Sequence, residues 1–200
     1  MWFQRHARTE RLTYRPELAS DDEKRRAFDE WHDHLYWTAL LITGSPEKSS
    51  DALVDAAALA ENEYTVFRDW LIQWTRDATS RMAIEKIRES ILTASATYEQ
   101  KVPCSHSDHT PLTIEQIDAI RQLPMEVVHA GLDPFARAVL ALRGIKQDSI
   151  TNCARVLGVP RMRVLAAYCM ALHWAEQSLV CRNAFASIRS CPLSGATQTR

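Results

Sequence analysis

The segment that decides the expected fold reads Ser149-Ile-Thr-Asn-Cys-Ala-Arg-Val-Leu-Gly158-Val-Pro-Arg-Met-Arg-Val164. A short amphipathic helix would end at Gly158, because glycine accepts the positive φ of a tight turn. Pro160 can open a second helix, since proline is favoured in a first turn. Val159 and Val164 can fill the angle between the two helices. The pattern predicts a helix-turn-helix unit, which sets the start of its second helix into the major groove of DNA.

Three arginines of this unit are candidate DNA-binding residues: Arg155, Arg161 and Arg163. Arg161 and Arg163 fall in the first turn of the second helix, where a guanidinium can contact guanine or phosphate. A plain helical hairpin with solvated arginines is the alternative, because the pattern is short and degenerate. The segment alone therefore leaves DNA binding open.

The composition predicts an all-α protein. Five glycines in 200 residues are too few for the many tight turns of a β-sandwich or a Rossmann sheet. Residues 94–112 have no helical periodicity and collect Ser, Thr, His and Pro, as linkers do. We expect two small helical domains joined by a flexible linker. The domains are 20–93 and 113–186, the second holding the helix-turn-helix; the linker is 94–112, and 1–19 and 187–200 are flexible termini.

Local signals place the helix ends. Capping boxes at Ser20–Glu23 and Thr113–Gln116 each predict a helix start. A long apolar periodicity predicts one helix over about 65–92. Further starts are expected at Ser45-Pro46, at Asp133-Pro134 and at Asp148, and a stop is expected at Gly44.

The net charge of −1 conceals an asymmetry along the chain. Residues 21–90 hold 15 acids and 9 bases, a net −6, whereas residues 132–179 hold 3 acids and 6 bases, a net +3. Residues 180–200 add another +3. This distribution favours a protein partner for the first half and a nucleic acid for the second.

Other classes of function find little support. No apolar run is long enough to span a membrane, and the N-terminus lacks the apolar core of a secretory signal. Five cysteines, an odd number without tight pairing, are expected to stay reduced in a cytoplasm. Cys104, His106 and His109 form a weak zinc candidate that lacks a fourth ligand. No nucleophile elbow, phosphate loop or His-Glu-x-x-His motif is present, so neither an enzyme nor a cofactor is expected.

The helix before the turn makes the pattern more specific. Leu132-Asp-Pro-Phe-Ala-Arg-Ala-Val-Leu-Ala-Leu-Arg143 resembles the Leu-Pro-x-x-x-Arg-x-Val-Leu-x-Leu-Arg helix that precedes the helix-turn-helix of bacterial sigma factors. Three N-terminal blocks resemble the extracytoplasmic-function branch of that family, in the same order. They are Leu41-Ile-Thr-Gly44, Asp51-Ala-Leu-Val-Asp55 and Phe67-Arg-Asp-Trp-Leu71.

The resemblance spans residues 28–176 apart from the linker, and it implies three tasks. Residues around 51–57 would dock on the coiled coil of the largest RNA polymerase subunit, through Asp51, Leu53, Val54 and Asp55. The helix over 67–90 would bind and melt the −10 element. The helix-turn-helix would read the −35 element of promoter DNA.

Candidate contacts of the −10 type are Trp74, Arg76, Arg81, Lys86 and Arg88. An aromatic ring can stack on an extruded base, and the cations can hold phosphates. Trp70 and Trp74 lie four residues apart on one helical face, so core packing is the more ordinary role for both, and the family pattern also implies a buried Trp70.

Three departures from the family pattern bear on function. Val54 replaces a glutamine expected to contact polymerase, and Asp77 replaces an asparagine in the −10 helix. After Arg163 the recognition helix carries Leu165 and Ala167 where the family has bases, so its flank is apolar. An exposed apolar flank would indicate a protein contact.

Two main hypotheses follow. The chain is expected to be a sigma factor that binds core RNA polymerase and promoter DNA. Alternatively, it is a sigma-like protein that binds an anti-sigma factor or another regulator with little DNA binding. A helical DNA-binding regulator unconnected with polymerase is a third possibility.

Overall fold

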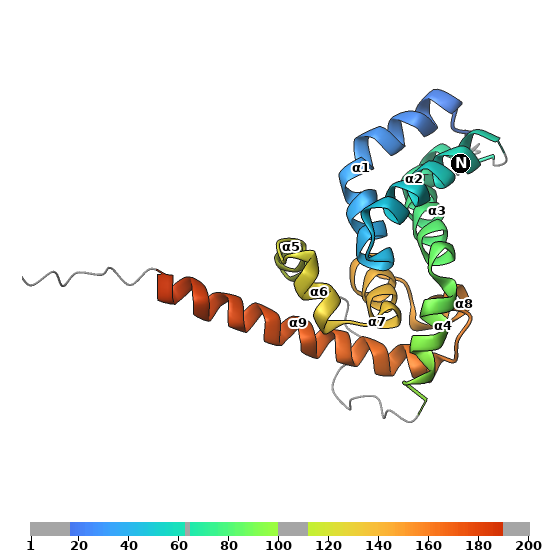
Figure 1. The fold of residues 1–200 in the computed structure, drawn as a ribbon. Helices are drawn as coiled ribbons and strands as arrows, with labels where there is room; N and C mark the ends of the chain where they lie inside the picture. The colour runs from blue at the N-terminus through green and yellow to red at the C-terminus, as the bar shows by residue number, and fades with distance from the viewer. Residues whose placement is uncertain (1–16, 63–64, 100–111, 190–200) are drawn as a thin grey trace, which may run out of the picture.

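The computed structural model describes residues 17–62, 65–99 and 112–189, and the secondary-structure elements of these residues are all helices, which confirms the all-α expectation. Figure 1 shows α1 to α3 stacked above α7, with the long helix α9 below them. The N-terminal helices are α1 (Asp21–Thr43), α2 (Pro46–Asn62), η1 (Arg68–Trp70), α3 (Leu71–Lys86) and α4 (Arg88–Ala96). The C-terminal helices are α5 (Ile114–Arg121), α6 (Met125–Gly131), α7 (Pro134–Val139), η2 (Leu140–Ile145), α8 (Ile150–Leu157) and α9 (Arg161–Arg189).

Local chemistry sets most helix ends where the sequence predicts them. Both capping boxes form: the side chains of Ser20 and Thr113 accept hydrogen bonds from backbone amides three residues on. Asp133 caps α7 by accepting from the amide of Ala136 at 2.8 Å. Gly44 ends α1 with a φ of 70°, and a Cβ there would lie 2.8 Å from the His129 ring, so only glycine fits.

Two predicted helix boundaries are wrong, and one helix changes type along its length. The single helix expected over about 65–92 is broken at Ile87, which departs from helical geometry and separates α3 from α4. The cap of α8 is Ser149 rather than Asp148, because the Ser149 hydroxyl accepts from the Asn152 amide at 3.1 Å. The helix over 134–143 changes at Leu140 into a π-helical turn, η2.

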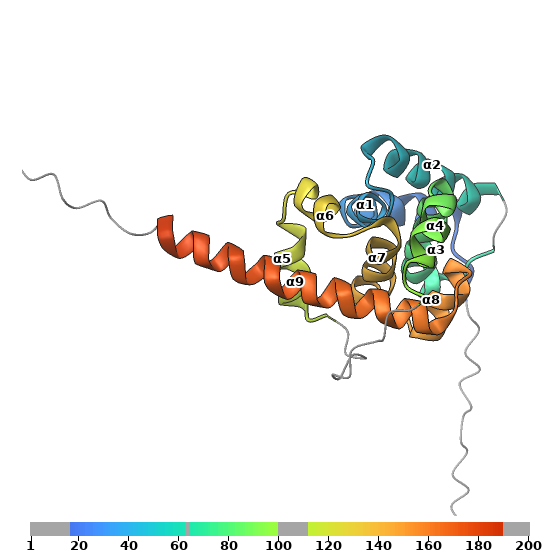
Figure 2. The same cartoon turned by 60° about the horizontal axis from the view of Figure 1, so that its bottom comes forward.

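Buried side chains of both predicted domains form one hydrophobic cluster. It joins α1, α3 and α4 to α7, η2, α8 and α9 across the 94–112 segment. In Figures 1 and 2, α7 lies between α1 and α9. Every residue of 135–145 is buried, so the α7–η2 segment is covered on all sides. The two segments therefore pack together and share a core.

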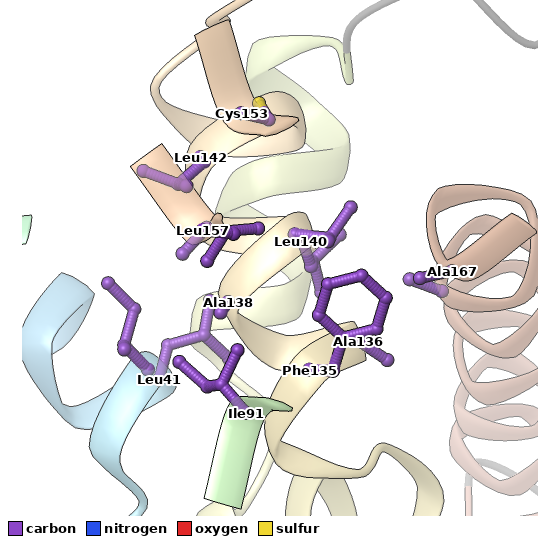
Figure 3. Close-up of a cluster of buried hydrophobic side chains, with 14 of the residues drawn as sticks. Leu41, Ile91, Phe135, Ala136, Ala138, Leu140, Leu142, Cys153, Leu157 and Ala167 are labelled. Carbon is purple, nitrogen blue, oxygen red and sulfur yellow. The ribbon is translucent and has the colours of Figure 1, made fainter. Parts of the chain in front are cut away.

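Figure 3 shows how the elements meet around this segment: Leu41 comes from α1, Ile91 from α4, Leu157 from α8 and Ala167 from α9. Phe135, fully buried, lies edge-on to the ring of Tyr98 with centroids 5.2 Å apart. Such aromatic pairs add to the gain from burial. Phe135 thus links α7 to the end of the α4 segment.

Polar contacts join the same two segments. Lys146 lies 2.7 Å from Asp77 of α3 and 2.7 Å from Asp148. The Tyr98 hydroxyl donates to Asp133 at 2.7 Å, and burial raises the pKa of Tyr98. The buried Arg137 donates from Nε to the carbonyl of Leu41 at 3.1 Å, at the C-terminal end of α1. These contacts satisfy polar groups that the shared core would otherwise leave unpaired.

The cysteines differ from the expectation that all stay reduced. Cys169, on α9, is disulfide-bonded. Cys153 is a free, buried thiol, and burial raises its pKa to about 12. A thiol of that kind is inert, because the thiolate is the reactive form. The other three cysteines lie outside the residues whose side chains the structure describes.

Candidate nucleic-acid and protein interfaces

Helix α8, the turn at Gly158 and the start of α9 have the local geometry that the sequence predicts. Gly158 adopts a φ of 69°, and its amide donates to the carbonyl of Ala154. Val159 and Val164 are buried between the two helices. The open side of the turn faces away from the core, because nothing lies within 4 Å of a Cβ built on Gly158.

The three arginines of this unit differ in their surroundings. Arg161 is exposed in the first turn of α9. Arg163 is partly buried and ion-pairs with Glu99 at 3.1 Å, so its guanidinium already has an anionic partner. Arg155 is exposed on α8 and donates to the Asn152 side chain at 2.7 Å. Arg161 and Arg155 are thus the more accessible of the three.

Most of the apolar flank of the second helix is covered, against the expectation, although Met162 and Met170 are exposed. Ala167 is fully buried, and Leu165 is partly buried against the core cluster. Tyr168 is also fully buried, with the Arg143 guanidinium 5.7 Å from its ring centroid. These residues are covered because α9 packs along α7 here.

The −10 type candidates on α3 and α4 split into two groups. Arg81 is exposed, whereas Arg88 ion-pairs with Glu85 at 2.6 Å and Lys86 with Asp55 of α2 at 2.6 Å. Arg76 is partly buried, and that burial lowers its pKa. A buried cation is poorly placed for a phosphate. Through its ion pair with Asp55, Lys86 joins the candidate DNA-binding helix α3 to the candidate polymerase-binding helix α2.

The two tryptophans reverse the expected order of burial. Trp74 is partly buried against a small cluster formed by Ala19, Ala27, Val66 and Leu71. Trp70, expected in the core, is 67% exposed in η1. Since η1 precedes α3 as a separate 3-10 turn, Trp70 does not share the apolar face of the following helix. Trp70 therefore presents its ring to solvent, and the prediction of a buried Trp70 is wrong.

The candidate polymerase face on α2 borders a hollow of about 480 Å³ between α1 and α2. Val54 and Leu53 line it together with Phe28 and Tyr36 of α1, which the sequence did not single out. Val54 is 67% exposed, and Asp51 is exposed one turn before it. An exposed apolar residue at the edge of a hollow, flanked by carboxylates, suits a protein contact.

A groove of about 330 Å³ brings together arginines predicted for two different DNA elements. Arg81 and Arg88 line it from α3 and α4, and Arg155 lines it from α8. Glu85 also lines the groove, and the hydrogen bond from Arg88 lowers its pKa. No local sequence pattern predicts this juxtaposition, because Arg155 follows Arg88 by 67 positions along the chain.

A small cavity of about 10 Å³, the size of one water, lies between α1, α3 and Lys146. His34 and Arg76 line it, and the buried Thr79 hydroxyl there has no hydrogen-bond partner within the described residues. Burial and the charges of Arg121 and Arg76 lower the pKa of His34 to about 4. His34 is therefore neutral at neutral pH.

The described residues contain no group of three or more His, Cys, Asp or Glu side chains placed to hold a metal ion. The zinc candidate Cys104, His106 and His109 lies outside the described residues. Among the described helices, none has the length and apolar character needed to cross a membrane.

Comparison of the chain with protein-family models, with curated proteins and with solved structures finds no match.

Proposed function

We propose that the chain is a sigma-like protein that acts in bacterial transcription initiation, docking on core RNA polymerase through α2 and contacting promoter DNA through its exposed arginines. The observation that carries this proposal is the hollow beside Val54. It borders the helix for which the resemblance implies polymerase docking, and its apolar walls adjoin the exposed carboxylate of Asp29. A basic and apolar helical hairpin is the complementary partner.

Charge supports the same assignment. The 21–90 segment carries a net −6, which suits a basic protein surface. The exposed Arg155 and Arg161 lie on α8 and α9, which belong to the net-positive segment.

The proposal predicts that Val54→Asp weakens capture of core polymerase about tenfold or more. Removing a buried valine from an interface loses about 1.5–3 kcal/mol, and each 1.4 kcal/mol is a factor of ten. The matched control is Val127→Asp, since Val127 is also exposed (43%) but lies on α6. Affinity is measured by titrating labelled protein with purified core polymerase. Equal affinity of the wild type and both variants, or no binding by the wild type, would contradict polymerase docking through this hollow.

A second candidate is a sigma-like protein controlled by a regulator, with little promoter reading. The shared core favours it. Promoter elements centred at −10 and −35 lie 25 base pairs apart, about 85 Å along a duplex, whereas the arginines assigned to them line one groove. Transcription by core polymerase from a promoter library separates the two: initiation at defined promoters supports the first candidate, and polymerase binding without initiation supports the second.

A further inference from the structure

The solvent-exposed groove between α3, α4 and α8 is rich in arginine. Three arginines and one glutamate line it, a net charge of +2, and Met82 and Val156 contribute apolar walls. Arg81 and Arg155 are exposed, so their guanidinium groups reach solvent. Guanidinium groups converging on one groove match the phosphates of a nucleic-acid backbone.

The groove walls are held in place by the shared core. Ile84 and Ile91, from α3 and α4, are buried in the same cluster as Leu157 of α8. The Asp77–Lys146 ion pair joins the middle of α3 to the segment that leads into α8. Rigid walls matter, because a site formed by two independently moving domains would lose affinity through the entropy of ordering them.

We propose that Arg81, Arg88 and Arg155 form a single phosphate-binding groove for one short stretch of duplex DNA, rather than parts of two separate promoter-reading sites. The inference deepens the proposed function and depends on its DNA contact, but not on polymerase docking.

Glu85 competes with DNA phosphate for the Arg88 side chain and so lowers the DNA affinity of this groove. Its carboxylate holds the Arg88 guanidinium through Nε at 2.7 Å and Nη2 at 2.6 Å. DNA phosphate must displace this carboxylate to use Arg88 fully. Glu85→Gln removes the competing charge, so we expect it to raise DNA affinity about fivefold. Glu89→Gln is the matched control, because Glu89 is also exposed on α4 but does not line the groove.

The test uses the full chain and a fluorescent duplex of about 12 base pairs, little more than one helical turn. Such a duplex can occupy one groove but cannot span two elements that lie about 85 Å apart. Arg81→Ala and Arg155→Ala are each expected to weaken binding about tenfold at low salt and to lower the salt slope by about one unit. Arg26→Ala removes an exposed charge from α1 and is expected to leave binding unchanged.

Sensitivity of the short duplex to both Arg81→Ala and Arg155→Ala supports the single groove. Sensitivity to one of them alone, or no binding of the short duplex by the wild type, overturns it. Both arginines are exposed, so thermal unfolding of each variant should match the wild type. Since Val54 lies outside the groove, polymerase capture reports separately on the proposed function. Wild-type protein that captures polymerase but does not bind the short duplex overturns this inference alone.

Discussion

Phe135→Ala is expected to destabilise both segments of the chain together, by about 3–5 kcal/mol. Phe135 is fully buried in the middle of the shared cluster, and its removal leaves a cavity and breaks the edge contact with Tyr98. A loss of this size is a large part of the 5–15 kcal/mol that stabilises an ordinary domain. Since the core continues from α1 to α9, amides of α3 and of α8 should lose protection to the same extent.

Hydrogen exchange followed by mass spectrometry measures this directly, because it reports on each helix separately. Phe67→Ala serves as the control, since Phe67 is 43% exposed and its truncation should change stability by about 0.5 kcal/mol or less. Loss of protection in α8 and α9 with unchanged protection in α3 would show two independent domains and contradict the shared core.

Arg137→Met is expected to lower the free energy of unfolding by about 2–4 kcal/mol. The buried guanidinium donates to the carbonyls of Leu41 at 3.1 Å and Leu132 at 3.0 Å. Methionine keeps the apolar part of the side chain but leaves two buried acceptors without donors, at about 1–3 kcal/mol each. Burial lowers the pKa of Arg137, so part of this loss is offset by no longer burying a charge.

Urea unfolding followed by circular dichroism gives the value, with Arg26→Met as the control because Arg26 is exposed on α1. An unfolding midpoint for Arg137→Met equal to that of the control would show that Arg137 does not hold the end of α1 against α7.

The sequence predicted well those features that depend on near neighbours. Capping at Ser20, Thr113 and Asp133 is decided by side chains within three residues of the helix start. The positive φ at Gly158 follows from the absence of a Cβ. Such features need no knowledge of the rest of the chain.

Features set by contacts between distant residues were missed or wrong. Trp70 was expected to be buried because aromatics on an apolar helical face usually are, but the separate turn η1 directs it to solvent. Ala167 was expected to be exposed because the family presents bases there, but α7 covers it. Both outcomes depend on which helix packs on which face.

The candidate site shows the same division. The sequence identified Arg81, Arg88 and Arg155 as cations able to hold phosphate, and they do line an open groove. The family resemblance assigned them to two surfaces, Arg81 and Arg88 to the −10 contact and Arg155 to the helix-turn-helix. The charge pair that joins the segments, Asp77 with Lys146, spans 69 residues. Asp77 departs from the family pattern, and in the structure it forms an ion pair with Lys146.

The shared core, and with it the single groove, is tested most directly by a zero-length carbodiimide cross-link between Lys146 and Asp77, whose charged atoms lie 2.7 Å apart. The pair Lys86 and Asp55, 2.6 Å apart within the N-terminal segment, is the internal control. Peptide mapping is expected to find both cross-links in the monomeric protein. Lys146 also lies 2.7 Å from Asp148, so a Lys146–Asp148 cross-link shows that this amine reacts. Recovery of the Lys86–Asp55 and Lys146–Asp148 cross-links without any Lys146–Asp77 cross-link would show that α3 and the C-terminal segment do not pack together, and would contradict the account.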